Sequence, residues 1–150
     1  MNWSSRSAAY CILRLTVGFV FLMYGIGKLI EGVNEFTAGL EKQFAETFLP
    51  GTLITLFGIA LPFLETLIGI LLIFGLFTRY AIAFAGLLMI VLTTGLAVVG
   101  NPEGVGHNLV YSFILFGLLY YNEDNRWAID RLFNSSNHHV PVEFRHRKTA

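Results

Sequence analysis

The chain has 150 residues, of which 55% are hydrophobic and 13% are charged, and its mean hydropathy is +0.63. These values lie far from the averages of soluble domains and indicate a single membrane-embedded domain. Acidic and basic residues balance to a formal net charge of zero, so we expect no nucleic-acid partner.

Four apolar runs are long enough, or nearly so, to cross about 30 Å of hydrocarbon at about 1.5 Å per residue. Only helices satisfy the backbone of such isolated runs in lipid. The first run resembles a signal peptide, but its length and the lack of an A-x-A site indicate a retained helix. The sequence therefore predicts an all-α membrane protein, a four-transmembrane-helix bundle with crossings at about 8–30, 52–77, 79–100 and 105–122.

The segment between the first two runs, residues 31–50, is amphipathic. Phe36, Leu40, Phe44 and Phe48 recur at helical spacing with acidic residues between them, which favours an outer interfacial helix over the mouth of the bundle. An irregular outer loop is the alternative, because the pattern is short. The next connection is almost absent, which predicts that the second and third helices are antiparallel neighbours.

Two segments follow the fourth run. Residues 124–134 predict a cytoplasmic amphipathic helix that completes the transmembrane domain, 1–134. Residues 135–150 are polar and basic, and they predict a flexible tail that meets anionic lipid. The adjacent His138 and His139 would suit a metal ion, but a solvated tail is the favoured interpretation.

Most positive charges fall on one side of the four predicted crossings. The positive-inside rule then places both the N and C termini in the cytoplasm, in a protein integral to a bacterial inner membrane. The side assigned to the cytoplasm carries Arg6, Arg14, Arg79, Arg126, Arg131, Arg145, Arg147 and Lys148, against Lys28 and Lys42 on the outer side.

Glu65 lies near the middle of the second run. A carboxylate at that depth costs roughly 2.5–3.5 kcal/mol on insertion scales, so it must face other helices, either paired with a cation or protonated. Gly58, Pro62 and Gly69 share its helical face, which predicts close helix packing and a kink at the proline. Glu65 marks either a functional site or a carboxyl group that only bonds helix to helix.

Arg14 and Lys28 are the cations of the first run. They share a helical stripe with Gly18, Phe21 and Gly25, so this stripe is expected to face protein. Arg14 is a natural partner for Glu65, although its depth also allows its guanidinium to reach the inner headgroups. Lys28 is interpreted first as an anchor at the outer edge, with a functional role as the alternative.

Three further residues complete the candidate polar site. Arg79 follows the tight turn after the second run and is interpreted mainly as a positive-inside anchor. His107 and Asn108 open the fourth run, either as a helix cap or, with Lys28, as part of a polar mouth. Gly104 and Gly106 are interpreted as a turn, since no phosphate loop, catalytic motif or metal motif is present. The candidate buried polar site comprises Arg14, Lys28, Glu65, Arg79, His107 and Asn108.

The ordered set of these residues resembles the DoxX family of small four-helix membrane proteins, over about residues 8–121. The resemblance implies a membrane subunit of a quinone-linked oxidoreductase, with a redox partner subunit. Disulfide chemistry, known for relatives with paired cysteines, does not extend to a chain whose one cysteine is Cys11. The stretches LRLTVGFVFLMYGIGKL and PFLETLIGILLIFGLFTRYA carry the resemblance, through Arg14, Gly18, Gly25, Lys28, Glu65, Gly69, Gly75, Thr78 and Arg79.

Three functional hypotheses follow. A redox-associated subunit, ranked first, would bind a quinone or a similar apolar carrier at the charged interior. A small-solute or lipid binding or transport protein would use Glu65 as a protonatable switch. A non-catalytic scaffold would use the charges only to register its helices. Any enzymatic role would depend on a partner, and the oligomeric state stays open.

Overall fold

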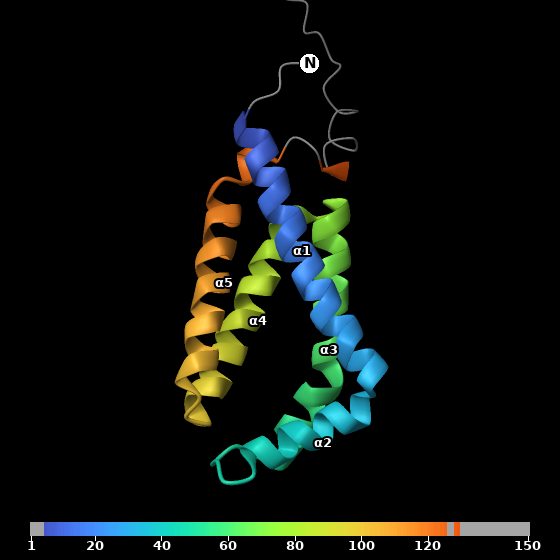
Figure 1. Cartoon of the computed structure of the whole chain (residues 1–150), viewed down its shortest axis with the longest axis vertical. Coiled ribbons are helices and arrows are strands. Elements are labelled where there is room, and N and C mark those ends of the chain that lie inside the picture. The colour runs from blue at the N-terminus through green and yellow to red at the C-terminus, as the bar shows by residue number, and fades with distance from the viewer. Residues whose placement is uncertain (1–4, 126–127, 130–150) are drawn as a thin grey trace, which may run out of the picture.

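The computed structural model describes residues 5–125 and 128–129. This part of the chain is all-helical and contains no strand (Figure 1). Each of the four apolar runs forms a helix, as predicted. The predicted helix at 124–134 falls mostly outside the described residues, and the tail at 135–150, with His138 and His139, falls entirely outside them. The helices are α1 (Ser5–Glu31), α2 (Val33–Phe44), α3 (Gly51–Phe74), α4 (Thr78–Val98), α5 (Pro102–Tyr120) and a short 3-10 turn, η1 (Asn122–Asp124).

Three of these helices, α1, α3 and α4, are long and apolar enough to cross a membrane. The fourth long helix, α5, has 19 residues, and its first turns carry Glu103, His107 and Asn108. With these polar residues, α5 is not among the helices that qualify as membrane spans by length and composition alone. Large apolar side chains on the outer faces of the long helices, such as Phe63 and Phe113, are exposed, which suits a surface that meets lipid.

The packing of α1 against α3 is the closest in the bundle. The backbones approach where glycines face them: a Cβ added to Gly69 would lie 2.5 Å from the Leu22 nitrogen, and one added to Gly25 would lie 2.8 Å from the Pro62 oxygen. Such small residues let two helices pack at backbone distance. The predicted inward stripes are confirmed, since Arg14, Gly18, Phe21 and Gly25 of α1 and Gly58, Pro62, Glu65 and Gly69 of α3 are all buried.

A three-residue turn joins α3 to α4. Gly75 ends α3 in the left-handed conformation, with φ of +66°, and its N–H donates to the carbonyls of Leu71 and Leu72. Phe77 then precedes α4 with φ of +47°. A turn this short makes α3 and α4 antiparallel neighbours, which confirms the prediction.

The amphipathic segment at 31–50 contains α2, so the alternative of an irregular loop is wrong for residues 33–44. Figure 1 shows α2 lying across one end of the long helices. Its Thr37 is buried against α3, where a Cβ added to Gly58 would lie 2.9 Å from the threonine hydroxyl oxygen. Phe36 packs against the core cluster from the same helix. The helix α2 therefore packs on α3 and covers one end of the bundle.

Candidate functional site

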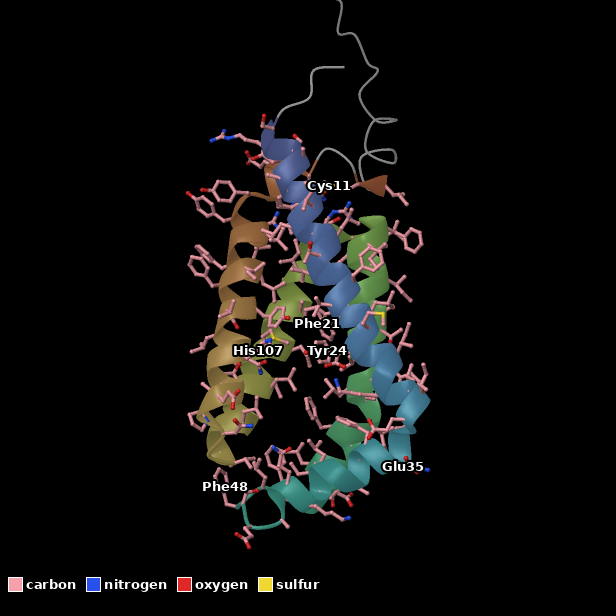
Figure 2. All side chains as sticks on the ribbon, in the orientation of Figure 1. Cys11, Phe21, Tyr24, Glu35, Phe48 and His107 are labelled. Atoms are coloured by element: carbon pink, nitrogen blue, oxygen red, sulfur yellow. The ribbon has the colours of Figure 1, made fainter. Side chains whose placement is uncertain are left out.

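A cavity of about 330 Å³ lies within the bundle. All five α-helices contribute to its walls, and α2 adds Phe36 and Leu40 at the end that it covers. Most of the lining is apolar or aromatic, which is typical of sites that bind small organic molecules. In Figure 2 the labelled Phe21 and Tyr24 of α1 and His107 of α5 lie in the space between these two helices.

The charged part of the cavity is an ion pair. Lys28 Nζ lies 2.6 Å from Glu65 Oε2, and the two side chains are 18% and 7% exposed. Glu65 thus has a cationic partner, and this partner is Lys28 rather than Arg14. The lysine stem runs inward from the last turn of α1, so Lys28 is more than an outer anchor.

Two aromatic rings flank the same ammonium group. The Nζ of Lys28 is 5.4 Å from the ring centroid of Tyr24 and 5.4 Å from that of Phe36. A cation at this distance over a ring face is attracted by the quadrupole of the ring. Lys28 is therefore held by residues of α1, α2 and α3 together, which fixes its position in the wall.

The opposite wall comes from α5. His107 stacks on Tyr111, with ring centroids 5.2 Å apart and an interplanar angle of 11°, and Asn108 lines the cavity beside them. The side chain of Asn101 accepts a hydrogen bond of 2.9 Å from the Gly104 nitrogen and caps the helix. The cap interpretation of His107 and Asn108 is therefore wrong, since both lie in the second turn of α5.

The turn predicted at Gly104 and Gly106 is also wrong, because both glycines lie inside α5. The helix begins at Pro102, whose ring suits a first helical position where no N–H donor is needed. Because glycines weaken a helical pattern, Gly104 and Gly106 made the beginning of α5 hard to predict from the sequence.

Arg14 lies at a different level of the bundle. It is 2% exposed, and its guanidinium donates to the carbonyl of Leu72 and, at 3.2 Å, to that of Ile73. These carbonyls belong to the last turn of α3, two turns beyond Glu65, or about 10 Å at about 1.5 Å per residue. A cation there adds a charged donor at the end of the backbone hydrogen-bond ladder, where the Leu72 carbonyl otherwise accepts from the Gly75 N–H, and it complements the helix dipole. Arg14 thus binds the carboxyl-terminal end of α3 and does not line the cavity.

Arg79 is separate from the cavity as well. It is exposed at the start of α4 and lines a surface pocket with Tyr80, Tyr120 and Glu123. The six residues of the candidate polar site therefore fall in three places. Lys28, Glu65, His107 and Asn108 share the cavity, while Arg14 and Arg79 do not belong to it.

Tyr24 and Tyr111 are cavity residues that the candidate polar site did not include. A signal was present, because Tyr24 precedes Lys28 by four residues and so lies over the same helical face. Within 5–125 and 128–129, no three His, Cys, Asp or Glu side chains gather as a metal site would require.

The walls and the polar groups together define what the cavity can do. The Lys28–Glu65 pair can donate and accept hydrogen bonds on one side, and His107 and Asn108 can do so from α5. The aromatic side chains between them offer flat apolar surfaces. Such a cavity suits a planar ligand with polar atoms at opposite edges.

Residues 6–104 match the sequence model of a family described as methylamine utilisation protein MauE. Among curated proteins and among solved structures, no match to the chain was found. The resemblance to the DoxX family is therefore wrong. The residues that carried it mark close helix packing and charged helix ends, which small helical membrane proteins share more widely. Since the match covers about two-thirds of the chain, the protein belongs to the MauE family of methylamine utilisation proteins, a family of membrane proteins.

Proposed function

We propose that the protein is a membrane-embedded binding component of a redox system for methylamine utilisation, and that its cavity takes a quinone-type ring. The family name supports the link to methylamine utilisation. The observation that carries the proposal is the Lys28–Glu65 pair in the wall of a largely apolar cavity. A redox partner subunit would supply or accept the electrons.

The charges argue against methylammonium itself as the ligand. Glu65 is already paired with the ammonium of Lys28, so a second small cation would displace a resident charge or be repelled by it. A neutral ring meets no such penalty. Its two carbonyl oxygens would accept hydrogen bonds from Lys28 and Asn108, while Tyr24 and Phe21 would pack on its faces.

Binding of a benzoquinone to the purified protein in lipid nanodiscs tests this function. We expect saturable binding to the unmodified protein. The double variant Lys28→Gln, Glu65→Gln should bind at least about tenfold more weakly, because a hydrogen bond to a charged group contributes about 1.5–3 kcal/mol. Arg79→Gln removes a charge outside the cavity and should bind as the unmodified protein does.

The two other functional hypotheses predict different results. A transport protein would carry labelled methylamine into proteoliposomes, and a lipid-binding protein would retain a stoichiometric phospholipid instead of the quinone. A scaffold would bind neither ligand. Any of these three outcomes, without saturable quinone binding, contradicts the proposal.

We further propose that α5 is a fourth crossing and that both termini are cytoplasmic. The alignment of α5 along α4 supports this topology (Figure 1). So do the exposed apolar side chains Val110, Phe113 and Phe116 on its outer face. The excess of arginine on one side of the crossings supports the orientation.

A further inference from the structure

A groove of about 410 Å³ lies on the outer surface beside the cavity. Its walls are Phe19, Val20, Met23, Tyr24 and Tyr111. Val20, Tyr24 and Tyr111 also line the internal cavity, so the two spaces share one wall. The groove therefore opens beside the cavity, between α1 and α5.

The helix arrangement explains this opening. The main packing partner of α1 is α3, and that of α5 is α4. Figure 1 shows α1 and α5 diverging as they run toward the end where α2 lies. The side chains at the groove are largely exposed, with values of 53% for Phe19, 65% for Met23 and 55% for Tyr24. No described helix therefore covers the groove between α1 and α5. In a membrane, the groove faces the acyl chains.

The cavity and the groove differ in the polarity of their walls. The cavity contains the charged pair of Lys28 and Glu65, whereas none of the five groove residues is charged. The end of the cavity that meets α2 is lined by Phe36 and Leu40. A ligand with a polar ring and a long apolar chain would satisfy both regions at once, with the ring inside and the chain in the groove.

We propose that this groove is a tail-binding subsite, which holds the isoprenoid or alkyl chain of the ligand and admits the ligand sideways from the lipid. The inference rests on the proposed function, because it assigns the ring to the cavity. A phospholipid fits less well, since its charged phosphate would have to enter a largely apolar cavity in which Lys28 is already paired with Glu65.

Two probes with the same ring separate the head from the tail. One is a methoxy-substituted benzoquinone without a tail, and the other carries a decyl chain on that ring. We expect the decyl chain to strengthen binding to the unmodified protein in phosphatidylcholine nanodiscs at least tenfold. The double variant Phe19→Ala, Met23→Ala should lose most of this gain and keep the affinity for the tailless ring, because neither residue lines the cavity.

A matched control uses two lipid-facing residues of α3. Phe63 and Leu67 are 56% and 51% exposed and do not belong to the groove. The double variant Phe63→Ala, Leu67→Ala should keep the full gain from the decyl chain. An equal loss in this control would overturn the subsite, since the chain would then contact the apolar surface of the bundle without preference for the groove.

Photolabelling provides a measurement that needs no variant. A diazirine at the end of the decyl chain should label the peptide that contains Phe19 and Met23. Labelling elsewhere, or a chain gain unchanged in the groove variant, would overturn the subsite while leaving ring binding intact. Labelling of this peptide by a photoreactive phospholipid that the quinone cannot displace would also overturn it. If neither probe binds saturably, the proposed function fails and the subsite fails with it.

Discussion

Lys28 and Glu65 form the central interaction at the scale of single residues. The two side chains of the pair differ in how far they can move toward the membrane surface. Lys28 has a long stem near a helix end, so its ammonium can reach the headgroups when its partner is lost. Glu65 is short and deep, and without Lys28 its carboxyl group remains in the bundle.

This asymmetry predicts unequal effects of single substitutions. Lys28→Met should lower the free energy of unfolding by about 3 kcal/mol, because it strands a buried charge. Glu65→Gln should cost less, about 1 kcal/mol, because Lys28 can move outward. Thermal unfolding in mild detergent measures both, together with the double variant. Additive effects in the double variant would show that the pair contributes nothing to stability.

Arg14 provides a second prediction at this scale. Arg14→Gln should lower the free energy of unfolding by about 1.5–3 kcal/mol, since the carbonyls of Leu72 and Ile73 lose a charged donor. Ring binding in the cavity should not change, because Arg14 lies about two turns from Glu65. Arg79→Gln is the control and should stay within about 0.5 kcal/mol. A loss of ring affinity in Arg14→Gln would contradict the assignment to the end of α3.

The cation that pairs with Glu65 could not be predicted from the sequence. Arg14 and Lys28 lie on one helical stripe, so helical periodicity supports either cation. The choice depends on how far α1 is shifted along α3, which no single-helix pattern reports. The structure pairs Leu22 with Gly69 and Gly25 with Pro62 and Thr66, and this antiparallel register brings Lys28 to Glu65.

At the scale of elements, the contact between α1 and α3 depends on small residues. Gly25 and Gly27 lie two positions apart on α1 and offer a matched pair. A Cβ on Gly25 would lie 2.5 Å from the Thr66 nitrogen, whereas one on Gly27 would meet nothing within 4 Å. Helix propensity favours alanine at both positions by about 1 kcal/mol, so any difference between them reports the packing.

Gly25→Ala should therefore lower the free energy of unfolding by about 1–3 kcal/mol, because the backbones of α1 and α3 must separate. Gly27→Ala should leave stability unchanged or raise it slightly. Parallel thermal unfolding of the two variants is the measurement. Equal stability of the two would mean that α1 and α3 are not in close contact in the membrane.

The helices themselves were largely predictable, for reasons that differ between elements. Long apolar runs gave α1, α3 and α4, because only helices satisfy the backbone in lipid. The start of α5 was missed by several residues, since Gly104 and Gly106 hide a helix that Asn101 caps and Pro102 begins. The amphipathic spacing of Phe36, Leu40 and Phe44 was sufficient to predict α2.

At the scale of the whole molecule, the position of α5 decides the topology. With the N-terminus in the cytoplasm, as proposed, four crossings place Glu103 outside and Tyr121 in the cytoplasm, whereas three crossings place both outside. Single cysteines at these two positions, in a Cys11→Ser background, test the difference. We expect a membrane-impermeant maleimide to label Glu103→Cys in intact cells and Tyr121→Cys only after permeabilisation. Labelling of both in intact cells would exclude the fourth crossing.

The cavity could not be predicted from the sequence, because it depends on how five helices meet. Glu65 and Lys28 were recognisable as polar residues in apolar runs, and His107 and Asn108 as polar residues at a helix start. Their common location follows from the divergence of α1 from α5, which depends on tertiary packing. Tyr24 and Tyr111 look like ordinary membrane tyrosines until this arrangement is known.

The sequence separation of 37 between Lys28 and Glu65 also orders events during biosynthesis. Lys28 enters the membrane before Glu65, its counter-charge on α3, can reach it there. At that stage we expect Lys28 to lie among the lipid phosphates, which its long stem can reach. We expect the insertion of α3 to draw the ammonium inward, so that the chain changes from a form that is bound to headgroups to the internally paired form of the structure.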